Sequence, residues 1–145
     1  MQLAHDVAFR HDADHALVAA FAARAGDRLK DLNGAAVWSM DEAELRDTRL
    51  HLTQVEAQLS ALKLQVLAEA DRRGVTDTDG SPTAAEWVAV RTRQTKPAAR
   101  DDLRLARSLD TMPTLQRGLA AGEVNLAQAR VIATAIDRLP SKGED

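Results

Sequence analysis

The sequence predicts an all-α fold: a multi-helix domain in which a long amphipathic helix is followed by a cluster of shorter helices. Its four Pro and seven Gly lie almost entirely between segments of helical periodicity. No run alternates apolar and polar residues as a half-buried strand would. A chain of 145 residues has the length of one domain, so we expect residues 1–145 to form a single helical domain.

Composition and the positions of helix-breaking residues divide this domain into four parts. We expect an N-terminal helix and linker at 1–38, a long helix at 39–74, a cluster of short helices at 81–140 and a tail at 141–145. The tail is polar and holds no closing element, which favours continuation of the native protein into a longer chain.

Composition favours a cytoplasmic protein. The chain has no Cys, which excludes a disulfide framework and a Cys-based zinc site. It begins without the pattern of a signal peptide, and its longest uncharged apolar run, residues 16–23, is too short to span a bilayer. We therefore expect no membrane partner.

The first helix is expected over Asp14–Asp31, because apolar residues recur there on one face. They are Leu17, Phe21, Ala25 and Leu29. Asn33 and Gly34 are typical residues for ending a helix.

Near the start of this helix, His11 and His15 stand one helical turn apart with Asp12 beside the first, a spacing that zinc can use. A hydrolytic zinc site also needs a third ligand and usually a Glu at the second position, and the neighbouring sequence supplies neither. We expect solvated residues and no metal. A small metal-dependent enzyme centred on these histidines is the alternative.

The long helix is expected to start at a cap, Ser39 or Asp41, and to run to Arg73 before Gly74. Glu44 stands three residues beyond Asp41, as a capping box requires.

One side of the long helix carries a seam spaced by alternating steps of three and four residues. The seam comprises Leu45, Thr48, Leu52, Val55, Leu59, Leu62 and Val66. Such a seam needs a partner helix. That partner is either the first helix, folded back as an antiparallel hairpin, or the same helix of a second subunit, which would make the protein a homodimer.

The segment after the long helix resembles a calcium-binding loop in part. Four residues match positions of an EF-hand: Asp77, Asp79, Gly80 and Glu86. The first position of that loop must donate a carboxylate oxygen, but here it is Val75. We therefore interpret Asp77 and Asp79 as turn residues and expect no calcium.

Four short helices follow. They are expected at Thr83–Arg91, Lys96–Leu109, Pro113–Ala121 and Leu126–Leu139. Ser81 and Pro82 are suited to start the first of them, as N-cap and first helical residue, and Thr83 is the alternative cap. Gly122 ends the third helix, Asn125 caps the last and Pro140 ends the series.

The first two short helices have the spacing of a helix-turn-helix pair. Small or apolar residues recur where two such helices must touch, at Val88, Ala89, Ala99 and Leu103. Thr95 is suited to cap the second helix, with Pro97 in its first turn. Arg93 speaks against the pattern, because its position in the turn commonly takes a left-handed backbone that suits Gly.

The second helix of this pair is basic. Lys96, Arg100, Arg104 and Arg107 follow one another at steps of four, four and three, which places them on one side. Residues 82–118 carry 7 basic and 4 acidic side chains and are the only net-positive third of a chain with net charge −3.

These observations predict binding of double-stranded DNA. The predicted contacts are Arg91, Arg93, Lys96, Arg100, Arg104 and Arg107. The alternative is a solvated helix face whose cations pair with Asp101 or Asp102. The sequence offers no catalytic constellation, because its last His is His51 and no glycine loop could cradle a phosphate. We expect no cofactor and no small-molecule ligand.

Four stretches of the chain carry a resemblance to a known family. They are VEAQLSALKLQVLAEAD from Val55, AAEWVA from Ala84, PAARDDLRLARSL from Pro97 and AAGEVNLAQARVI from Ala120. In their order and spacing they resemble domain of unknown function 222 (DUF222), a bacterial family found at the N-terminus of HNH endonuclease-like proteins.

The resemblance implies a non-catalytic helical accessory domain that precedes a metal-dependent nuclease module. An HNH site needs His and Asn side chains to hold its metal, yet no His follows His51 and Asn125 is the only Asn beyond Asn33. Nuclease activity is therefore not carried over to this chain. Two functions remain: a DNA-associating module, or a protein interaction or dimerisation module with no nucleic-acid role.

Overall fold

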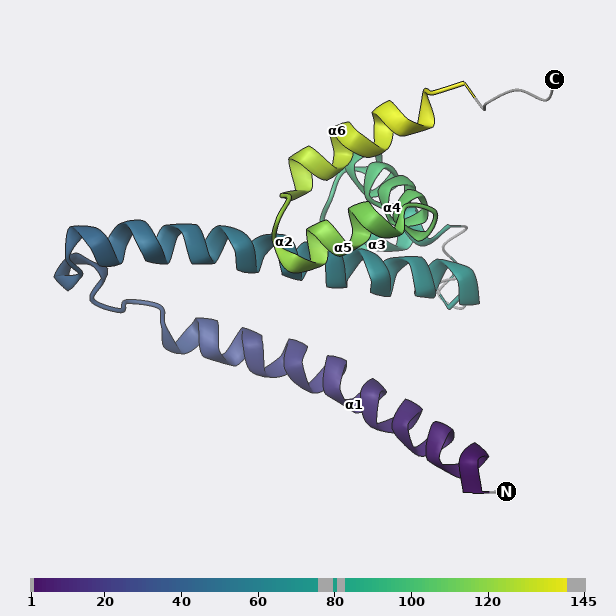
Figure 1. The fold of residues 1–145 in the computed structure, drawn as a ribbon, viewed down its shortest axis with the longest axis horizontal. Helices are drawn as coiled ribbons and strands as arrows, with labels where there is room; N and C mark the ends of the chain where they lie inside the picture. The colour runs from purple at the N-terminus through teal and green to yellow at the C-terminus, as the bar shows by residue number, and fades with distance from the viewer. Residues whose placement is uncertain (1, 76–79, 81–82, 141–145) are drawn as a thin grey trace. The chain divides into compact units, whose positions relative to one another are not determined.

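The computed structural model describes the backbone of residues 2–75, 80 and 83–140, and the side chains of the same residues from 17 onward. This part of the chain contains six α-helices, one short 3-10 helix and no strand, which confirms the predicted all-α class (Figure 1). In chain order the elements are α1 (Gln2–Asp31), η1 (Val37–Ser39), α2 (Glu42–Arg73), α3 (Ala84–Thr92), α4 (Lys96–Asp110), α5 (Pro113–Ala121) and α6 (Leu126–Asp137).

The chain separates into two compact units, Met1–Glu42 and Ala43–Asp145. The first unit holds α1 and η1. Helix α1 ends at Asp31 as predicted, but it begins at Gln2, so the predicted start at Asp14 is wrong. No Gly or Pro precedes Asp14, and a helix that meets no breaker continues.

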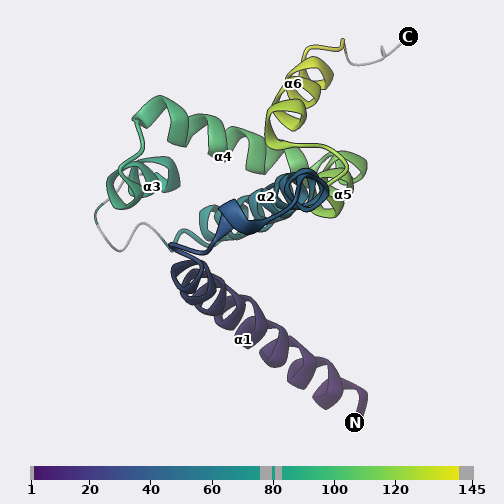
Figure 2. The ribbon, with the colours of Figure 1, turned by 90° about the vertical axis from the view of Figure 1, so that its left-hand side faces the viewer.

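The second unit is built on the C-terminal half of α2. This helix ends at Arg73, as predicted, and Gly74 follows it with a left-handed φ of 62°. Its buried residues begin only at Ala57, and within this unit the first turns of α2 run on beyond the other helices (Figures 1 and 2). Helices α3–α6 gather around the C-terminal half, which therefore carries the core.

The main core joins α2, α4, α5 and α6. Its buried members are Ala57, Ala61, Leu64, Ala68, Leu105, Ala106, Leu109, Leu115, Leu119, Ala129 and Ala133. Leu119 is the largest fully buried side chain described. Six of these eleven residues are alanines, and small side chains of this kind allow helix axes to approach closely.

Capping and helix-terminating residues mark the ends of the short helices. Helix α5 has the predicted bounds, and Gly122 ends it with a φ of 75°. Asn125 caps α6 with a complete capping box, in which its side chain accepts from the amide of Gln128 and the Gln128 side chain accepts from the Asn125 amide. Helix α6 stops at Asp137 rather than at Leu139.

Helix α3 begins later than predicted. It starts at Ala84, and its N-cap is Thr83, whose hydroxyl accepts from the Glu86 amide at 3.1 Å. The Thr83 hydroxyl thus satisfies a free amide in the first turn of α3. Ser81 and Pro82 themselves lie outside the described residues.

Candidate nucleic-acid interface

The predicted helix pair is present. Helix α3 ends at Thr92, three residues form the turn, and α4 begins at Lys96. The hydroxyl of Thr95 accepts from the Ala98 amide at 3.3 Å and so caps α4 as predicted, with Pro97 in the first turn. The two helices meet at an angle at this turn (Figure 2).

Arg93 takes the left-handed backbone conformation that the spacing predicts for its position. Its φ of 57° and ψ of 29° make it the one non-glycine residue with positive φ in the described part of the chain. A left-handed non-glycine residue costs about 1 kcal/mol, so the surrounding packing holds this turn in place.

A second, smaller core holds the helix pair together. Its buried members are Ala84, Ala85 and Ala89 of α3 with Ala99 and Leu103 of α4. Leu67 of α2 packs against this cluster and against the main core. The helix pair is thus fixed to the long helix through a shared side chain.

The predicted cations lie on the exposed side of the pair. Arg91, Arg93, Lys96, Arg100, Arg104 and Arg107 are all exposed. Within the described residues, neither Lys96 nor Arg100 makes an ion pair or a side-chain hydrogen bond. Arg104 pairs with Asp101 across 3.5 Å of exposed surface, a type of pair that contributes little to stability. The first turns of α4 therefore present cations that an anion can reach.

Arg107 differs from the others because its guanidinium group is hydrogen-bonded to a carboxylate on another helix. Its Nε and Nη2 donate to the two carboxylate oxygens of Asp71 on α2, both at 2.9 Å. The hydrogen bond to Asp71 raises the pKa of Arg107, partial burial opposes this, and the charge of Asp71 adds to the rise. This fork holds α4 on α2 and engages two of the three guanidinium nitrogens of Arg107.

Asp102 connects the turn to α6. It accepts from Nε2 of Gln94 at 3.2 Å and forms an ion pair with Arg130 of α6. Sequence spacing did not find Arg130, because it lies 28 residues from its partner and outside the net-basic segment. A cation of α6 is thereby placed beside the basic side of α4.

The seam of α2 does not face the core of its unit. The face of α2 that packs against α4, α5 and α6 is marked by Ala57, Ala61, Leu64 and Ala68. Seam residues remain exposed, by 43% at Leu45, 56% at Leu52, 53% at Val55, 41% at Leu59 and 52% at Val66, whereas Leu62 is half-buried. The spacing of large side chains does not reveal this face, because alanines mark most of it.

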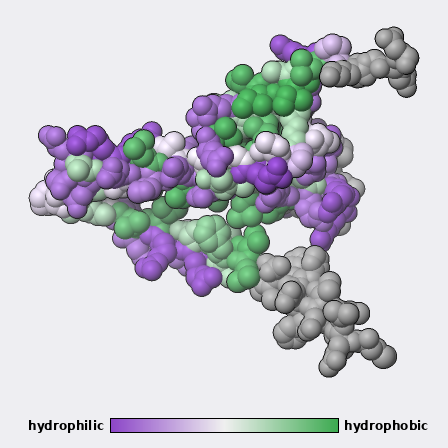
Figure 3. Space-filling model, in the orientation of Figure 1, coloured by the Kyte–Doolittle hydropathy of each residue, from purple (hydrophilic) through white to green (hydrophobic). Residues whose placement is uncertain are grey.

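Helix α6 also exposes apolar side chains. Figure 3 shows hydrophobic surface over this helix. Its members include Val131, Ile132 and Ile136, with Leu139 just beyond the helix end. An exposed apolar surface of this kind is typical of a contact site.

The remaining candidate sites fall mostly outside the description. His11, Asp12 and His15 lie within α1, but their side chains are not among those described. Asp77 and Asp79 lie outside the described residues. None of the described helices combines the length and apolar character that crossing a bilayer requires.

Comparison with known proteins identifies a family for this chain. A family model described as "Domain of unknown function (DUF222)" matches residues 46–144. The match covers α3–α6 and all but the first turn of α2. No curated protein and no solved structure matches the chain.

Proposed function

The chain belongs to the DUF222 family, and from that premise and the geometry of the helix pair we propose that it is a non-catalytic module that associates with duplex DNA. In this proposal Lys96, Arg100 and Arg104 of α4 contact backbone phosphates. Arg91 at the end of α3 and Arg93 in the turn approach the DNA backbone beside them. Arg107 is not among the contacts, since it holds α4 on α2.

One observation carries the proposal. A capped, three-residue turn joins two helices around a buried alanine cluster, and it leaves the exposed first turns of the second helix with cations that lack an intramolecular partner among the described residues. Recognition helices of helix-turn-helix proteins present the side chains of their first turns to DNA. Cations without counterions are the groups that gain most from phosphate.

The resemblance to proteins with an HNH module suggests how such a domain would be used. A nuclease module elsewhere in a longer protein would supply the metal-dependent chemistry. This chain would supply sequence-independent contacts to the backbone, which position a protein on DNA without selecting a sequence. No catalytic role is assigned to any of its residues.

A salt series tests DNA association. Fluorescence anisotropy with a labelled duplex should show an affinity that falls steeply with salt concentration. The double variant Lys96→Ala/Arg100→Ala should weaken binding about tenfold at low salt and reduce the salt slope by about 2, one for each lost phosphate contact.

A matched variant controls for net charge. Lys63→Ala/Arg117→Ala removes two exposed cations of the same unit that lie on α2 and α5. It should leave the salt slope close to that of the wild type. No binding at low salt, or an equal loss in both double variants, would refute DNA association through α4.

The exposed seam favours a second candidate function, dimerisation through α2. Light scattering over a concentration series should then show a mass that approaches twice that of one chain, and Leu52→Glu on the seam should restore the monomer. Leu50→Glu is the control, because Leu50 is 66% exposed on α2 but lies off the seam. A wild type that stays monomeric at high concentration removes this candidate.

A further inference from the structure

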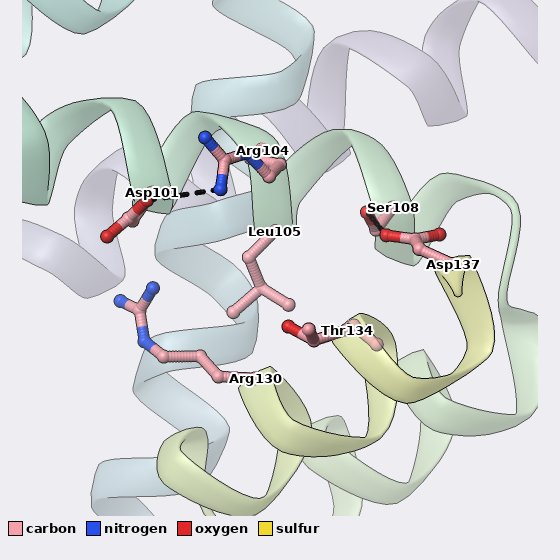
Figure 4. A pocket seen from close by; sticks show the side chains of 8 residues that line it. Asp101, Arg104, Leu105, Ser108, Arg130, Thr134 and Asp137 are labelled. Carbon is pink, nitrogen blue, oxygen red and sulfur yellow. Dashed lines mark hydrogen bonds and ion pairs between the residues drawn. The ribbon is translucent and has the colours of Figure 1, made fainter.

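A groove of about 200 Å³ lies between α4 and α6. Its polar lining comes from both helices: Asp101, Arg104 and Ser108 of α4, and Arg130, Thr134 and Asp137 of α6. Figure 4 shows the guanidinium groups of Arg104 and Arg130 on the two sides of Asp101. Two cations from different helices thus line one concave place.

We propose that this groove is a phosphate subsite, in which Arg104 and Arg130 together hold one backbone phosphate of a bound duplex. The proposal rests on the proposed DNA association and deepens it, because it adds α6 to an interface that the sequence placed on α3 and α4 alone. Guanidinium groups bind phosphate oxygens through paired N–H donors, and two of them at one site fix its position.

The groove is continuous with the basic side of α4. Lys96, Arg100 and Arg104 follow one another at steps of four residues, about 6 Å of rise each. Arg104 is the last of these three, and it also lines the groove. A nucleic-acid backbone that follows α4 from its N-terminus therefore arrives at the groove and at Arg130.

The carboxylates around the groove explain why both arginines are held in place without DNA. Arg104 pairs with Asp101, where the side chains are 74% and 56% exposed, so water screens the pair and a phosphate can replace it. Arg130 gives its Nη2 to Asp102 and keeps the other donors of its fork. Asp137 is occupied by the hydroxyl of Ser108 at 3.2 Å.

A charge-matched set of variants tests the subsite by the same anisotropy assay. Arg130→Gln should weaken duplex binding about fivefold at low salt and lower the salt slope by about 1, the value for one lost phosphate contact. Asp101→Asn should tighten binding about threefold, because it releases Arg104 and removes the competing carboxylate.

Each variant has a control with the same change of charge. Arg117→Gln removes an exposed cation on α5, and Asp110→Asn removes an exposed carboxylate at the last residue of α4. Both should change affinity less than twofold. The Asp101→Asn gain cannot arise from damage to the fold, so the test holds even if Arg130→Gln lowers the melting temperature.

The outcomes separate the subsite from the proposed function. If the wild type binds with a steep salt dependence but Arg130→Gln and Asp101→Asn behave like their controls, the subsite is refuted and DNA association stands. If the wild type shows no salt-dependent binding, DNA association fails and the subsite with it.

Discussion

Replacing Ala99 by leucine is expected to destabilise the helix pair by about 3 kcal/mol. Ala99 is completely buried in α4 and belongs to the cluster that joins α4 to Ala84, Ala85 and Ala89 of α3. Three additional carbon atoms have no space in a close-packed contact, so the helices must separate or the side chain must leave its rotamer. Chemical denaturation measures the loss.

The neighbouring residue provides the control. Ala98 lies in the same first turns of α4 but is exposed, and Ala98→Leu should change the free energy of unfolding by less than about 0.5 kcal/mol. The Ala99→Leu variant should also bind DNA more weakly, because it displaces α4 from the turn. Equal stability of the two variants would show that α3 and α4 do not pack as described.

Gly122→Ala is expected to cost about 2 to 3 kcal/mol. Gly122 ends α5 with a φ of 75°, where any side chain is strained by about 1 kcal/mol. Its new Cβ would also lie 3.1 Å from the carbonyl oxygen and the Cβ of Gln54, and 3.2 Å from the Gln54 Cα. Backbone atoms of α2 cannot yield as a flexible side chain would, so the turn between α5 and α6 must lift from α2.

Gly80→Ala separates the two causes. Gly80 has a φ of 73°, but no atom of the described residues lies within 4 Å of a Cβ placed there. This variant should therefore lose only the conformational part, about 1 kcal/mol. Thermal melts of both variants compare the losses, and an equal loss would mean that the α5–α6 turn does not rest on α2.

The helices whose bounds the sequence predicts best are those with a clear capping, proline or glycine residue at their ends. Pro113 and Gly122 bracket α5, and its bounds were predicted to the residue. Thr95 and Pro97 mark the start of α4 in the same way. These residues act locally through φ and through amides at helix ends, so neighbouring sequence contains the information.

The buried face of α2 was missed for a physical reason. Ala57, Ala61 and Ala68 line the core, yet alanine is equally at home on an exposed helix surface. The regular spacing of larger residues from Leu45 to Val66 instead marks a different face of α2, and that face is exposed. Only the positions of the other helices decide which face an alanine-rich helix buries.

The electrostatics of the site could be predicted only in part. Helical spacing places Lys96, Arg100 and Arg104 on one side because those residues share one helix. Arg107 stands in the same series, but its partner Asp71 is 36 residues away, and no local pattern records such a pair. Arg130 is a similar case, 28 residues from Asp102. Both pairs depend on how separate helices pack.

At Arg93, the residue that would give the most stable turn differs from the residue that would give the highest affinity for nucleic acid. Glycine adopts this conformation without the penalty that arginine pays, so a search for thermostable variants would favour Arg93→Gly. The same substitution would remove a cation from the corner between α3 and α4. In this protein a stabilised scaffold and a retained nucleic-acid affinity would therefore be competing objectives at Arg93, and optimising one alone would erode the other.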